Sequence, residues 1–424
     1  MSDSSVNPAP AAARSFSSRK WEVIVLLWFA FFLNQGDRQI YNSVLPLIGA
    51  DLKLDAIQLG LVATIFTVLY GVLVPVAGYA GDRFSRKWMV VASLAIFSIG
   101  TVFTGLAHGL ILLVVFRSIA TGAGEAFYYP AANALIGEYH HQSRARAMAI
   151  HQTANYTGVV VSGFLAAWIG EKWGWRASFL TFGFGGVLWA LLVAWRLKDA
   201  PRAAKSLALR VPLREVCAVV LRKPTVILLA LAFGGMVFVH IGYMTWMPTF
   251  LREKFKLSLA NSGFSSMFYH HVLAYAGVLF GGWLSDRMAP RRRQVRMEIE
   301  FAGLLLGAPF IMLMGSAGSL ALTYAALAGF GFFRGLYDSN LMAAAFDVIP
   351  PRYRASATGL ILSLGFIIGS AAPLVLGSMK SGMGLGVGLS SLGAVYLLSA
   401  ALVFVAMKCF FQRDFHHEQA PELI

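Results

Sequence analysis

The sequence predicts an all-α membrane protein with twelve transmembrane helices in two pseudo-symmetric six-helix halves. The 424-residue chain is 58% apolar and only 13% charged, with a mean hydropathy of +0.66, which lies outside the range of ordinary soluble proteins. Runs of about 20 or more mostly apolar residues, each long enough to span a bilayer, occur twelve times. Two pairs of segments also repeat one another, one member in each half of the chain.

The twelve apolar runs divide into six per half and place both termini on the same side of the membrane. The first run is too long for the apolar region of a cleavable signal peptide and has no small-residue cleavage site after it, so we expect it to be retained. The predicted spans are residues 21–47, 57–80, 88–106, 109–137, 146–170, 176–196, 224–251, 260–285, 297–314, 318–346, 355–379 and 386–411.

The repeated segments indicate that one structural unit is used twice. Residues 78–87 (GYAGDRFSRK) and 282–291 (GWLSDRMAPR) each end an apolar run with small residues, followed by Asp-Arg and a basic cluster. A second echo links residues 144–149 (RARAMA) with 354–359 (RASATG), each followed by a Gly-containing apolar run. Two homologous halves predict a pseudo-symmetric cleft at the membrane midplane, where secondary transporters bind substrate.

The placement of basic residues predicts the orientation of the chain. Of the 35 Lys and Arg residues, 25 fall in the tails and loops on one side, 7 on the other side and 3 within the spans. The positive-inside bias therefore puts both termini in the cytoplasm. The net charge of +15 is then a topology signal that attracts anionic lipid, and nucleic-acid binding, which needs a soluble basic face, is disfavoured. The predicted parts are a cytoplasmic N-tail (1–20), an N-terminal half (21–197), a cytoplasmic linker (198–223), a C-terminal half (224–411) and a cytoplasmic C-tail (412–424).

The sequence contains no pattern typical of a disulfide framework, a metal site or a nucleotide-driven pump. Its two cysteines, Cys217 and Cys409, both fall near the cytoplasmic side, and neither has metal-ligand spacing. No P-loop or nucleotide-binding Gly-rich loop occurs, which disfavours transport driven by ATP. We therefore expect no cofactor, no metal and no enzymatic activity.

The pattern G-x-x-x-D-R-x-x-R-K between the second and third spans, within twelve spans in two halves, resembles the major facilitator superfamily over nearly the whole chain. Ser85 stands where the family usually has Gly. The resemblance implies a cytoplasmic latch, in which the motif's acid faces the positive end of a neighbouring helix or pairs with basic residues. The alternative is that these residues are ordinary loop charges. It is disfavoured, because a loop that only sets the membrane orientation needs basic residues and has no need of an Asp at this point. The candidate gating residues are Asp82, Arg83, Arg86 and Lys87, with Asp286 and Arg287 of the second copy.

Six ionisable residues, three of each sign, lie in three of the predicted spans. Each would cost several kcal/mol alone at mid-bilayer, so we expect them to face one another or a wet cavity. The first, fourth, seventh and tenth helices line the cavity in the family that the chain resembles, and all six residues fall on three of those four. A purely structural role is the alternative, most of all for Arg117 and for Arg334 and Asp338, whose spacing allows pairing along one helix. The six are Asp37, Arg38, Arg117, Glu125, Arg334 and Asp338.

Two parts of the sequence indicate which branches of the superfamily the chain resembles. Residues 34–38 (NQGDR) and 122–133 (GAGEAFYYPAAN) resemble the anion:cation symporter branch, where an Asp-Arg pair on the first helix meets a Glu on the fourth. Residues 75–87 (PVAGYAGDRFSRK) are equally similar to Spinster-type transporters, which share the Asp-Arg and Glu elements. Both branches use the helix 1 Arg and the helix 4 Glu in coupling, so the resemblance implies that role for Arg38 and Glu125.

The Arg-Glu pair predicts a proton-coupling device. Desolvation favours the protonated form of a carboxyl group and a nearby guanidinium favours the ionised form, so a small movement of Arg38 relative to Glu125 can switch the carboxyl group. If an anionic substrate takes Arg38 as a bidentate partner, Glu125 loses its counter-charge and binds a proton. Asp37, about 100° round the helix from Arg38, would be a second titrating group or a structural acceptor.

Hydroxyl, amide, imidazole and charged groups on the same helices complete the predicted substrate site. Such groups suit polyhydroxy or carboxylated substrates, although buried Tyr and His are more often packing residues. The candidate substrate-binding residues are Arg38, Tyr41, Tyr128, Asn155, His240, Tyr243, Arg334 and Asp338.

These features predict a monomeric, proton-coupled symporter of a small organic anion, a sugar acid or other carboxylate, in a bacterial cytoplasmic (inner) membrane. Its expected partners are the anionic substrate, protons and membrane lipids. The alternative is a Spinster-like transporter of a lysolipid or other amphiphile, which would need an apolar cavity reaching the lipid; the polar content of the cavity-lining helices stands against it. A sensor without transport would need a long signalling tail, and the predicted tails are short.

Overall fold

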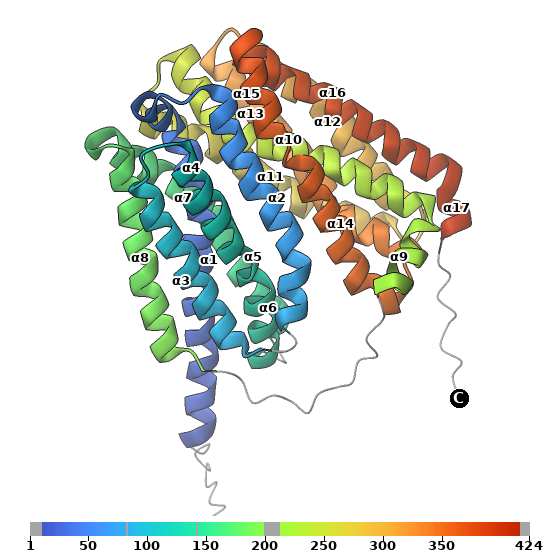
Figure 1. Cartoon of the computed structure of the whole chain (residues 1–424). Helices are drawn as coiled ribbons and strands as arrows, with labels where there is room; N and C mark the ends of the chain where they lie inside the picture. The colour runs from blue at the N-terminus through green and yellow to red at the C-terminus, as the bar shows by residue number, and fades with distance from the viewer. Residues whose placement is uncertain (1–10, 82–83, 141–142, 199–212, 416–424) are drawn as a thin grey trace, which may run out of the picture.

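The computed structural model describes residues 11–81, 84–140, 143–198 and 213–415, and these ranges are helical with no strand (Figure 1). Long helices run side by side in two groups that follow one another along the chain. The first group comprises α1 to α8 and the second comprises α9 to α17.

The N-terminal group supplies six spans, of which the fourth is assembled from four short helical segments. Each span is long enough to cross a bilayer at a rise of about 1.5 Å per residue. The elements are α1 (Ala11–Leu52), α2 (Ala56–Gly81), α3 (Arg86–Gly105), α4 (Leu110–Leu113), the π-helix η1 (Val114–Thr121), α5 (Gly122–Ala126), α6 (Tyr128–Tyr139), α7 (Arg144–Trp173) and α8 (Trp175–Arg196).

The C-terminal group repeats this plan after a short helix that precedes its first span. Its last two spans are each interrupted. The elements are α9 (Leu213–Leu221), α10 (Pro224–Phe255), α11 (Leu259–Met288), α12 (Val295–Ser316), α13 (Leu320–Val348), the 3₁₀ turn η2 (Pro351–Tyr353), α14 (Arg354–Gly369), α15 (Ala372–Gly382), α16 (Leu385–Val405), the π-helix η3 (Ala406–Phe410) and α17 (Phe411–Asp414).

The twelve-span, two-half fold class predicted from the sequence is confirmed by this helix order. Within the described ranges, nine spans are long and apolar enough to cross a membrane by composition alone, and the remaining three are α1, α7 and α11. These three carry buried polar side chains, such as Asn34 and Asp37 on α1 and His271 on α11. A membrane helix accommodates such groups when they face other helices or a wet cavity, which lowers its mean hydropathy.

The fourth span departs from a continuous α-helix at its centre. Val114–Thr121 form a π-helix. Such an insertion rotates the residues that follow it about the helix axis, so that they point toward different neighbours. Beyond it, α5 packs closely on α3, because a Cβ on Gly124 would lie only 2.6 Å from the Phe97 backbone nitrogen. Ser93 on α3 donates a hydrogen bond of 2.6 Å to the Gly124 carbonyl. This close approach positions Glu125 beside α1.

The two halves meet along two pairs of helices. The α2 helix packs against α14 and α15 (Figure 1), and α7 packs against α11. We call the end of the bundle with Asp51 the Asp51 end and the opposite end, with Arg86, the Arg86 end. Near the Asp51 end, Glu171 accepts hydrogen bonds from the backbone N–H groups of Leu259 and Ala260, at 3.3 and 3.4 Å. A carboxylate suits this position at the N-terminus of α11, where the helix dipole is positive.

Small residues allow the halves to approach closely. Gly163 on α7 faces Gly263 on α11, and a Cβ on Gly263 would lie 2.5 Å from the Gly163 carbonyl oxygen and 3.0 Å from Ala167 Cβ. At the other pair of helices, Ser363 on α14 donates a 2.9 Å hydrogen bond to the Gly71 carbonyl on α2. Small residues at helix contacts are the usual route to close packing in membranes.

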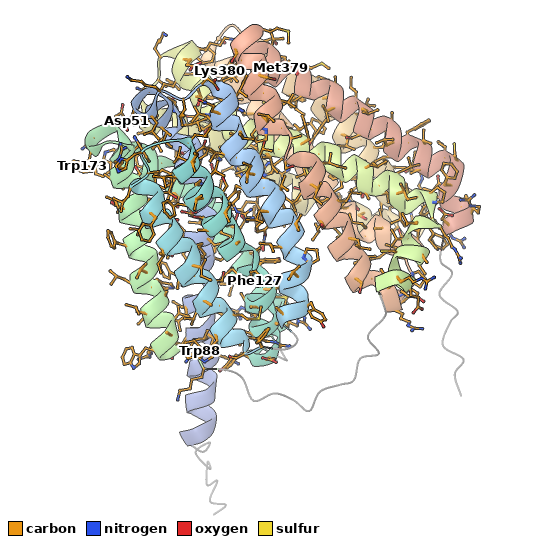
Figure 2. All side chains as sticks on the ribbon, in the orientation of Figure 1. Asp51, Trp88, Phe127, Trp173, Met379 and Lys380 are labelled. Atoms are coloured by element: carbon orange, nitrogen blue, oxygen red, sulfur yellow. The ribbon has the colours of Figure 1, made fainter. Side chains whose placement is uncertain are left out.

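Exposed tryptophans lie at both ends of the bundle, as expected for side chains at membrane–water interfaces. Trp173 is 62% exposed at the Asp51 end and Trp88 is 58% exposed at the Arg86 end (Figure 2). Asp51 itself forms an ion pair with Arg176 and accepts a 3.0 Å hydrogen bond from Trp175 Nε1. These hydrogen bonds, first that of Arg176 and then that of Trp175, hold the pKa of Asp51 below its ordinary value.

Replacing Gly263 with Leu should disfavour the conformation described here by about 1–3 kcal/mol, because overpacking a close contact costs about that much. Spin labels at Lys172 on α7 and Asn261 on α11 would report the result as a longer distance between these helices at the Asp51 end. The labelled protein would carry Ser in place of Cys217 and Cys409, the two native cysteines.

Gly282→Leu is the matched control, since a Cβ at Gly282 on the same helix meets no atom within 4 Å among the described residues. It should leave the label distances unchanged. Identical distance distributions for Gly263→Leu and the parent protein would show that the α7–α11 contact is not tight.

Candidate functional site

A cavity of about 370 Å³ lies between the two halves. Its lining comes from α1, α2, η1 and α7 of the N-terminal half and from α10, α11, α13 and α14 of the C-terminal half. This volume suits a small molecule. Aromatic and apolar side chains form part of the wall, so a limited set of polar groups decides the chemistry.

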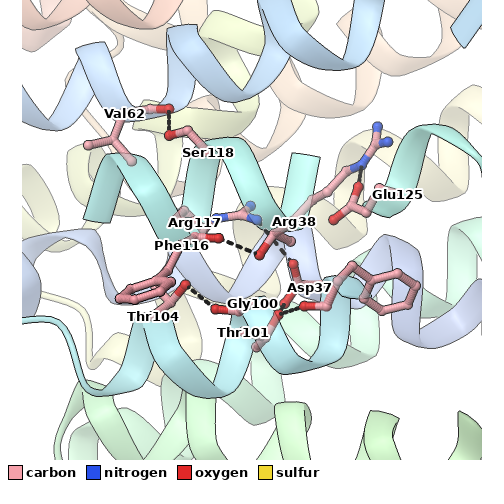
Figure 3. Close-up of polar contacts among 12 residues, drawn as sticks. Asp37, Arg38, Val62, Gly100, Thr101, Thr104, Phe116, Arg117, Ser118 and Glu125 are labelled. Carbon is pink, nitrogen blue, oxygen red and sulfur yellow. Dashed lines mark hydrogen bonds and ion pairs between the residues drawn. The ribbon is translucent and has the colours of Figure 1, made fainter. Parts of the chain in front are cut away.

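Arg38 and Glu125 form an ion pair at the wall of the N-terminal half. Arg38 Nε lies 2.5 Å from Glu125 Oε2 (Figure 3). The Glu125 side chain has no exposed surface, whereas that of Arg38 is 21% exposed and lines the cavity. The Tyr70 ring centroid lies 4.2 Å from Arg38 Cζ, a favourable cation–π distance. The pair therefore presents the guanidinium to the cavity and keeps the carboxylate behind it.

Each member of this pair has an atom without a partner. Among the described residues, no group hydrogen-bonds to Arg38 Nη2 or to Glu125 Oε1, although both atoms are buried. A buried donor without a partner is costly, so a ligand oxygen that reached Arg38 Nη2 would be favoured. The free Glu125 oxygen can carry a proton without first losing a hydrogen bond.

Asp37 and Arg117 form a second pair that is more deeply enclosed. Arg117 Nη1 lies 3.0 Å from Asp37 Oδ2, and Thr101 donates a 2.5 Å hydrogen bond to Asp37 Oδ1 (Figure 3). Both side chains of the pair are at most 5% exposed. Asp37 does not line the cavity, while Arg117 does and stacks over the Phe66 ring at 4.4 Å. Asp37 and Arg38 point to different neighbours because successive residues are turned by about 100° on a helix.

The C-terminal wall holds its charges on one helix. Arg334 Nε lies 3.3 Å from Asp338 Oδ2, one turn along α13, as their spacing predicted. Arg334 Nη1 also donates a 2.7 Å hydrogen bond to His240 Nδ1 on α10. Since a guanidinium can only donate, His240 Nδ1 must accept, which makes this imidazole neutral with its proton on Nε2.

Two further histidines lie beside this group on α11. His271 lines the cavity and donates from Nδ1 to the Met267 carbonyl at 2.8 Å, while His270 is fully buried. The His271 ring meets Tyr156 of the other half edge to face, with centroids 6.3 Å apart. Across the described part of the chain, no group of three or more His, Cys, Asp or Glu residues is arranged to hold a metal ion.

The charged groups that line the cavity are mostly cationic. Arg38, Arg117 and Arg334 all line it, whereas Asp338 is the one carboxylate among the described lining residues. The carboxylate partners of the first two arginines lie behind them. The cavity surface therefore favours an anionic ligand, although the whole set of six ionised groups is neutral.

A group of side-chain amides on the same wall was not predicted from the sequence. Gln39 is fully buried, lines the cavity and has no partner for Nε2 among the described residues. The signal was present in the sequence as a polar stripe at helical spacing on α1, formed by Gln35, Arg38, Gln39 and Asn42. With Gln152 on α7, these amides can exchange hydrogen bonds with ligand hydroxyl groups.

The predicted substrate-binding residues outside the ion pairs are placed differently. Asn155 and Tyr41 line the cavity, and the Tyr41 hydroxyl also donates a 2.8 Å hydrogen bond to the Leu59 carbonyl. Tyr128 and Tyr243 do not line it. Their hydroxyls donate to the backbone carbonyls of Leu27 and Ser266, respectively, so both side chains pack between helices.

The predicted gating residues that the structure describes lie near the Arg86 end. Arg86 forms an ion pair with Glu138 of α6, within the N-terminal half, and the Lys87 ammonium lies 5.0 Å from the Trp88 ring centroid. The second copy of the motif is exposed. Asp286 and Arg287 lie at the end of α11, with the Arg287 guanidinium 5.7 Å from the Trp283 ring centroid. Asp82 and Arg83 lie outside the described residues.

Comparison with known proteins agrees with this architecture. Residues 27–373 match the sequence profile of the Major Facilitator Superfamily. The chain is 25% identical over 410 residues to the hexuronate transporter of Bacillus subtilis (strain 168), covering 92% of this chain and 94% of that protein. It is 26% identical to the cis,cis-muconate transport protein of Acinetobacter baylyi, covering 92% and 95%. A crystal structure of a bacterial homologue of the human lysosomal transporter Spinster, inward-facing and unoccupied, superposes with a TM-score of 0.83 at 22% identity, covering 95% of this chain and 99% of that chain.

Replacing Arg117 with Met should destabilise the folded protein by about 3–5 kcal/mol, because the substitution leaves Asp37 as a buried charge without its counter-ion. The change would be measured as a lower midpoint of thermal unfolding for the purified protein in detergent.

Arg176→Met is the matched control, since it removes the arginine of the exposed pair with Asp51. Exposed pairs contribute about 0–1 kcal/mol, so this variant should unfold close to the parent protein. Equal losses of stability in the two variants would show that the Arg117 pair is not enclosed as described.

Proposed function

Because the chain belongs to the Major Facilitator Superfamily, we propose that it is a proton-coupled symporter of a small organic anion, a sugar acid or another carboxylate. The observation that carries this proposal is the pair of Arg38 and Glu125, in which the guanidinium lines the cavity and the carboxylate lies buried behind it. An anion bound at Arg38 and a proton bound at Glu125 would then each affect the binding of the other.

The proposed coupling step is an exchange of partners. A substrate carboxylate that binds Arg38, including its free Nη2, draws the guanidinium away from Glu125. Glu125 is then a buried carboxylate without a counter-charge, and it binds a proton to remain neutral. Binding of the anion therefore favours binding of the proton, and the reverse holds by linkage. Asp37, which is held by an ion pair with Arg117 and a hydrogen bond from Thr101, is proposed as a second titrating group.

The substrate class follows from the rest of the lining. Arg334, Asp338, His240, Tyr41 and Asn155 are proposed to contact the parts of the substrate beyond its carboxylate. Together with the amides of α1 and α7, they offer both donors and acceptors, which suits hydroxyl groups. The two bacterial relatives, a hexuronate transporter and a cis,cis-muconate transport protein, support an acidic substrate.

The excess of basic residues on one side supports placing both termini and the Arg86 end in the cytoplasm of a bacterial cell. In that orientation, we propose that the contact of α7 with α11 near the Asp51 end closes the outer side of the protein. Alternating access would require this contact to open while the Arg86 end closes. We propose that Asp82, Arg83, Arg86 and Lys87, with Asp286 and Arg287 in a weaker second copy, stabilise that closed cytoplasmic side, and that the protein works as a monomer.

A second candidate function is transport of a lysolipid or other amphiphile. The observation that favours it is the apolar part of the lining, which includes Phe66, Phe233, Met236, Val237 and Phe366. Three cavity-facing arginines and the amides oppose an alkyl chain at the centre of the site. A thermal-shift panel of sugar acids, aromatic acids and lysolipids on the purified protein separates the two candidates, because only bound ligands raise the unfolding midpoint.

Glu125→Gln should abolish accumulation driven by a proton gradient, because the amide cannot take up a proton, while exchange without net proton movement continues. The measurement is uptake of D-glucuronate, or the acid that the panel selects, into proteoliposomes with and without an inward proton gradient. Glu253→Gln, at an exposed pair with Lys380, is the control and should accumulate normally. Full gradient-driven accumulation by Glu125→Gln would refute the assignment of the proton site.

Arg38→Lys should weaken binding of the same anion by about tenfold or more, since Lys lacks the planar fork that binds a carboxylate through two hydrogen bonds. Isothermal titration of the purified variant would measure the dissociation constant. Arg196→Lys, at the exposed pair with Glu22, provides the matched control. If Arg38→Lys and Arg38→Ala both bind the anion like the parent protein, Arg38 has only a packing role.

A further inference from the structure

A buried carboxyl group on α12 has no role in the site described above. Glu300 is 0% exposed, and neither of its carboxyl oxygens has a hydrogen-bond partner within the described ranges of the chain. It does not line the cavity. Functional ionisable residues were predicted in three spans, and Glu300 was not among them although it lies inside the predicted span 297–314.

Glu300 lies on a face of α12 that packs closely on α13 and α16. Glu300, Gly303 and Gly307 share this face, since they are three and four residues apart. A Cβ on Gly303 would lie 3.4 Å from Tyr337 Cβ on α13, and one on Gly307 would lie 3.3 Å from the Tyr396 ring on α16. The glycines thus bring two tyrosines against the same face as the carboxyl group.

Both tyrosine side chains are fully buried, and their hydroxyls also have no hydrogen-bond partner in the part of the chain that the structure describes. Tyr337 interacts electrostatically with Glu300, Asp338 and Tyr396. Glu300, Tyr337 and Tyr396 therefore form a buried polar group between α12, α13 and α16, in which no member hydrogen-bonds to another.

The charges around Glu300 provide no counter-ion for it. The charged neighbour with which it interacts is Asp347 on α13, another carboxylate, and Asp347 is paired with Arg296 of α12. Arg334, a further cation of the C-terminal half, is paired with Asp338. An ionised Glu300 would be a buried charge with no compensation, whereas a neutral carboxylic acid fits the site.

We propose that Glu300 is a further proton-binding site, in the C-terminal half, and that Tyr337 and Tyr396 enclose its protonated carboxyl group. The carboxylate takes up one proton from water and returns it to water, so the exchange needs no oxidant or other reactant. This site is independent of the exchange between Arg38 and Glu125, and its test requires no substrate.

The first experiment is infrared spectroscopy of the protein in proteoliposomes of Escherichia coli polar lipid at neutral pH. Glu300→Gln should lose one carboxylic-acid C=O band that the parent protein shows. Glu298→Gln is the matched control, because Glu298 lies two residues away in a partly exposed ion pair with Arg292 and should leave the band in place. A spectrum of folded Glu300→Gln that retains every band of the parent would show that Glu300 is ionised and would overturn the proposal.

The second experiment tests whether Tyr337 encloses the carboxyl group, in a variant that keeps Glu300. After transfer into D₂O, the Glu300 band shifts as its proton is replaced. Tyr337→Ala should speed this exchange by about tenfold or more, because truncating a buried ring leaves a cavity beside the acid. Tyr324→Ala, at a tyrosine whose hydroxyl donates to Ser265 elsewhere on α13 and α11, is the control. Exchange in folded Tyr337→Ala at the rate of the parent protein would show that Tyr337 does not enclose Glu300 and would overturn this part of the proposal.

Discussion

A guanidinium or carboxylate inside a bilayer is stable only beside a partner, and the N-terminal half is organised around this requirement. Two adjacent residues of α1, Asp37 and Arg38, each reach a residue of the fourth span, Arg117 and Glu125. The π-helix and the close packing of Gly124 on α3 set the facing of that span. The ion pairs therefore join the first and fourth spans and build one wall of the cavity.

The two pairs differ in what surrounds them, and this difference decides which of them can exchange its partner for a ligand. Asp37 is satisfied by Arg117 and by the Thr101 hydroxyl, behind the wall. Arg38 is paired on one edge with Glu125 and open to the cavity on another. Only the second pair can exchange its partner for a ligand without opening the packed helices, so the proposed coupling rests on it.

The contact between the halves follows a different rule. Every ion pair found among the described residues joins two groups of the same half, such as Arg334 with Asp338. The halves instead meet through small residues, backbone groups and rings, for example Gly163 with Gly263 and Tyr156 with His271. Such contacts can separate without leaving a buried charge unpaired, which suits a protein whose halves rock against each other.

The sequence by itself determined the twelve spans, the two related halves and most of the charged residues of the cavity. The length of the apolar runs predicts the spans, and the repeated segments predict the halves. The high cost of a charge inside a membrane marks the charged residues as candidates for the cavity. Only the tertiary structure decided the partners. It paired Asp37 with Arg117, placed Tyr128 and Tyr243 between helices, and brought Gln39 into the cavity. Helical spacing fixes which residues share a face, but the direction in which that face points depends on how neighbouring helices pack, and glycines far along the chain set that packing.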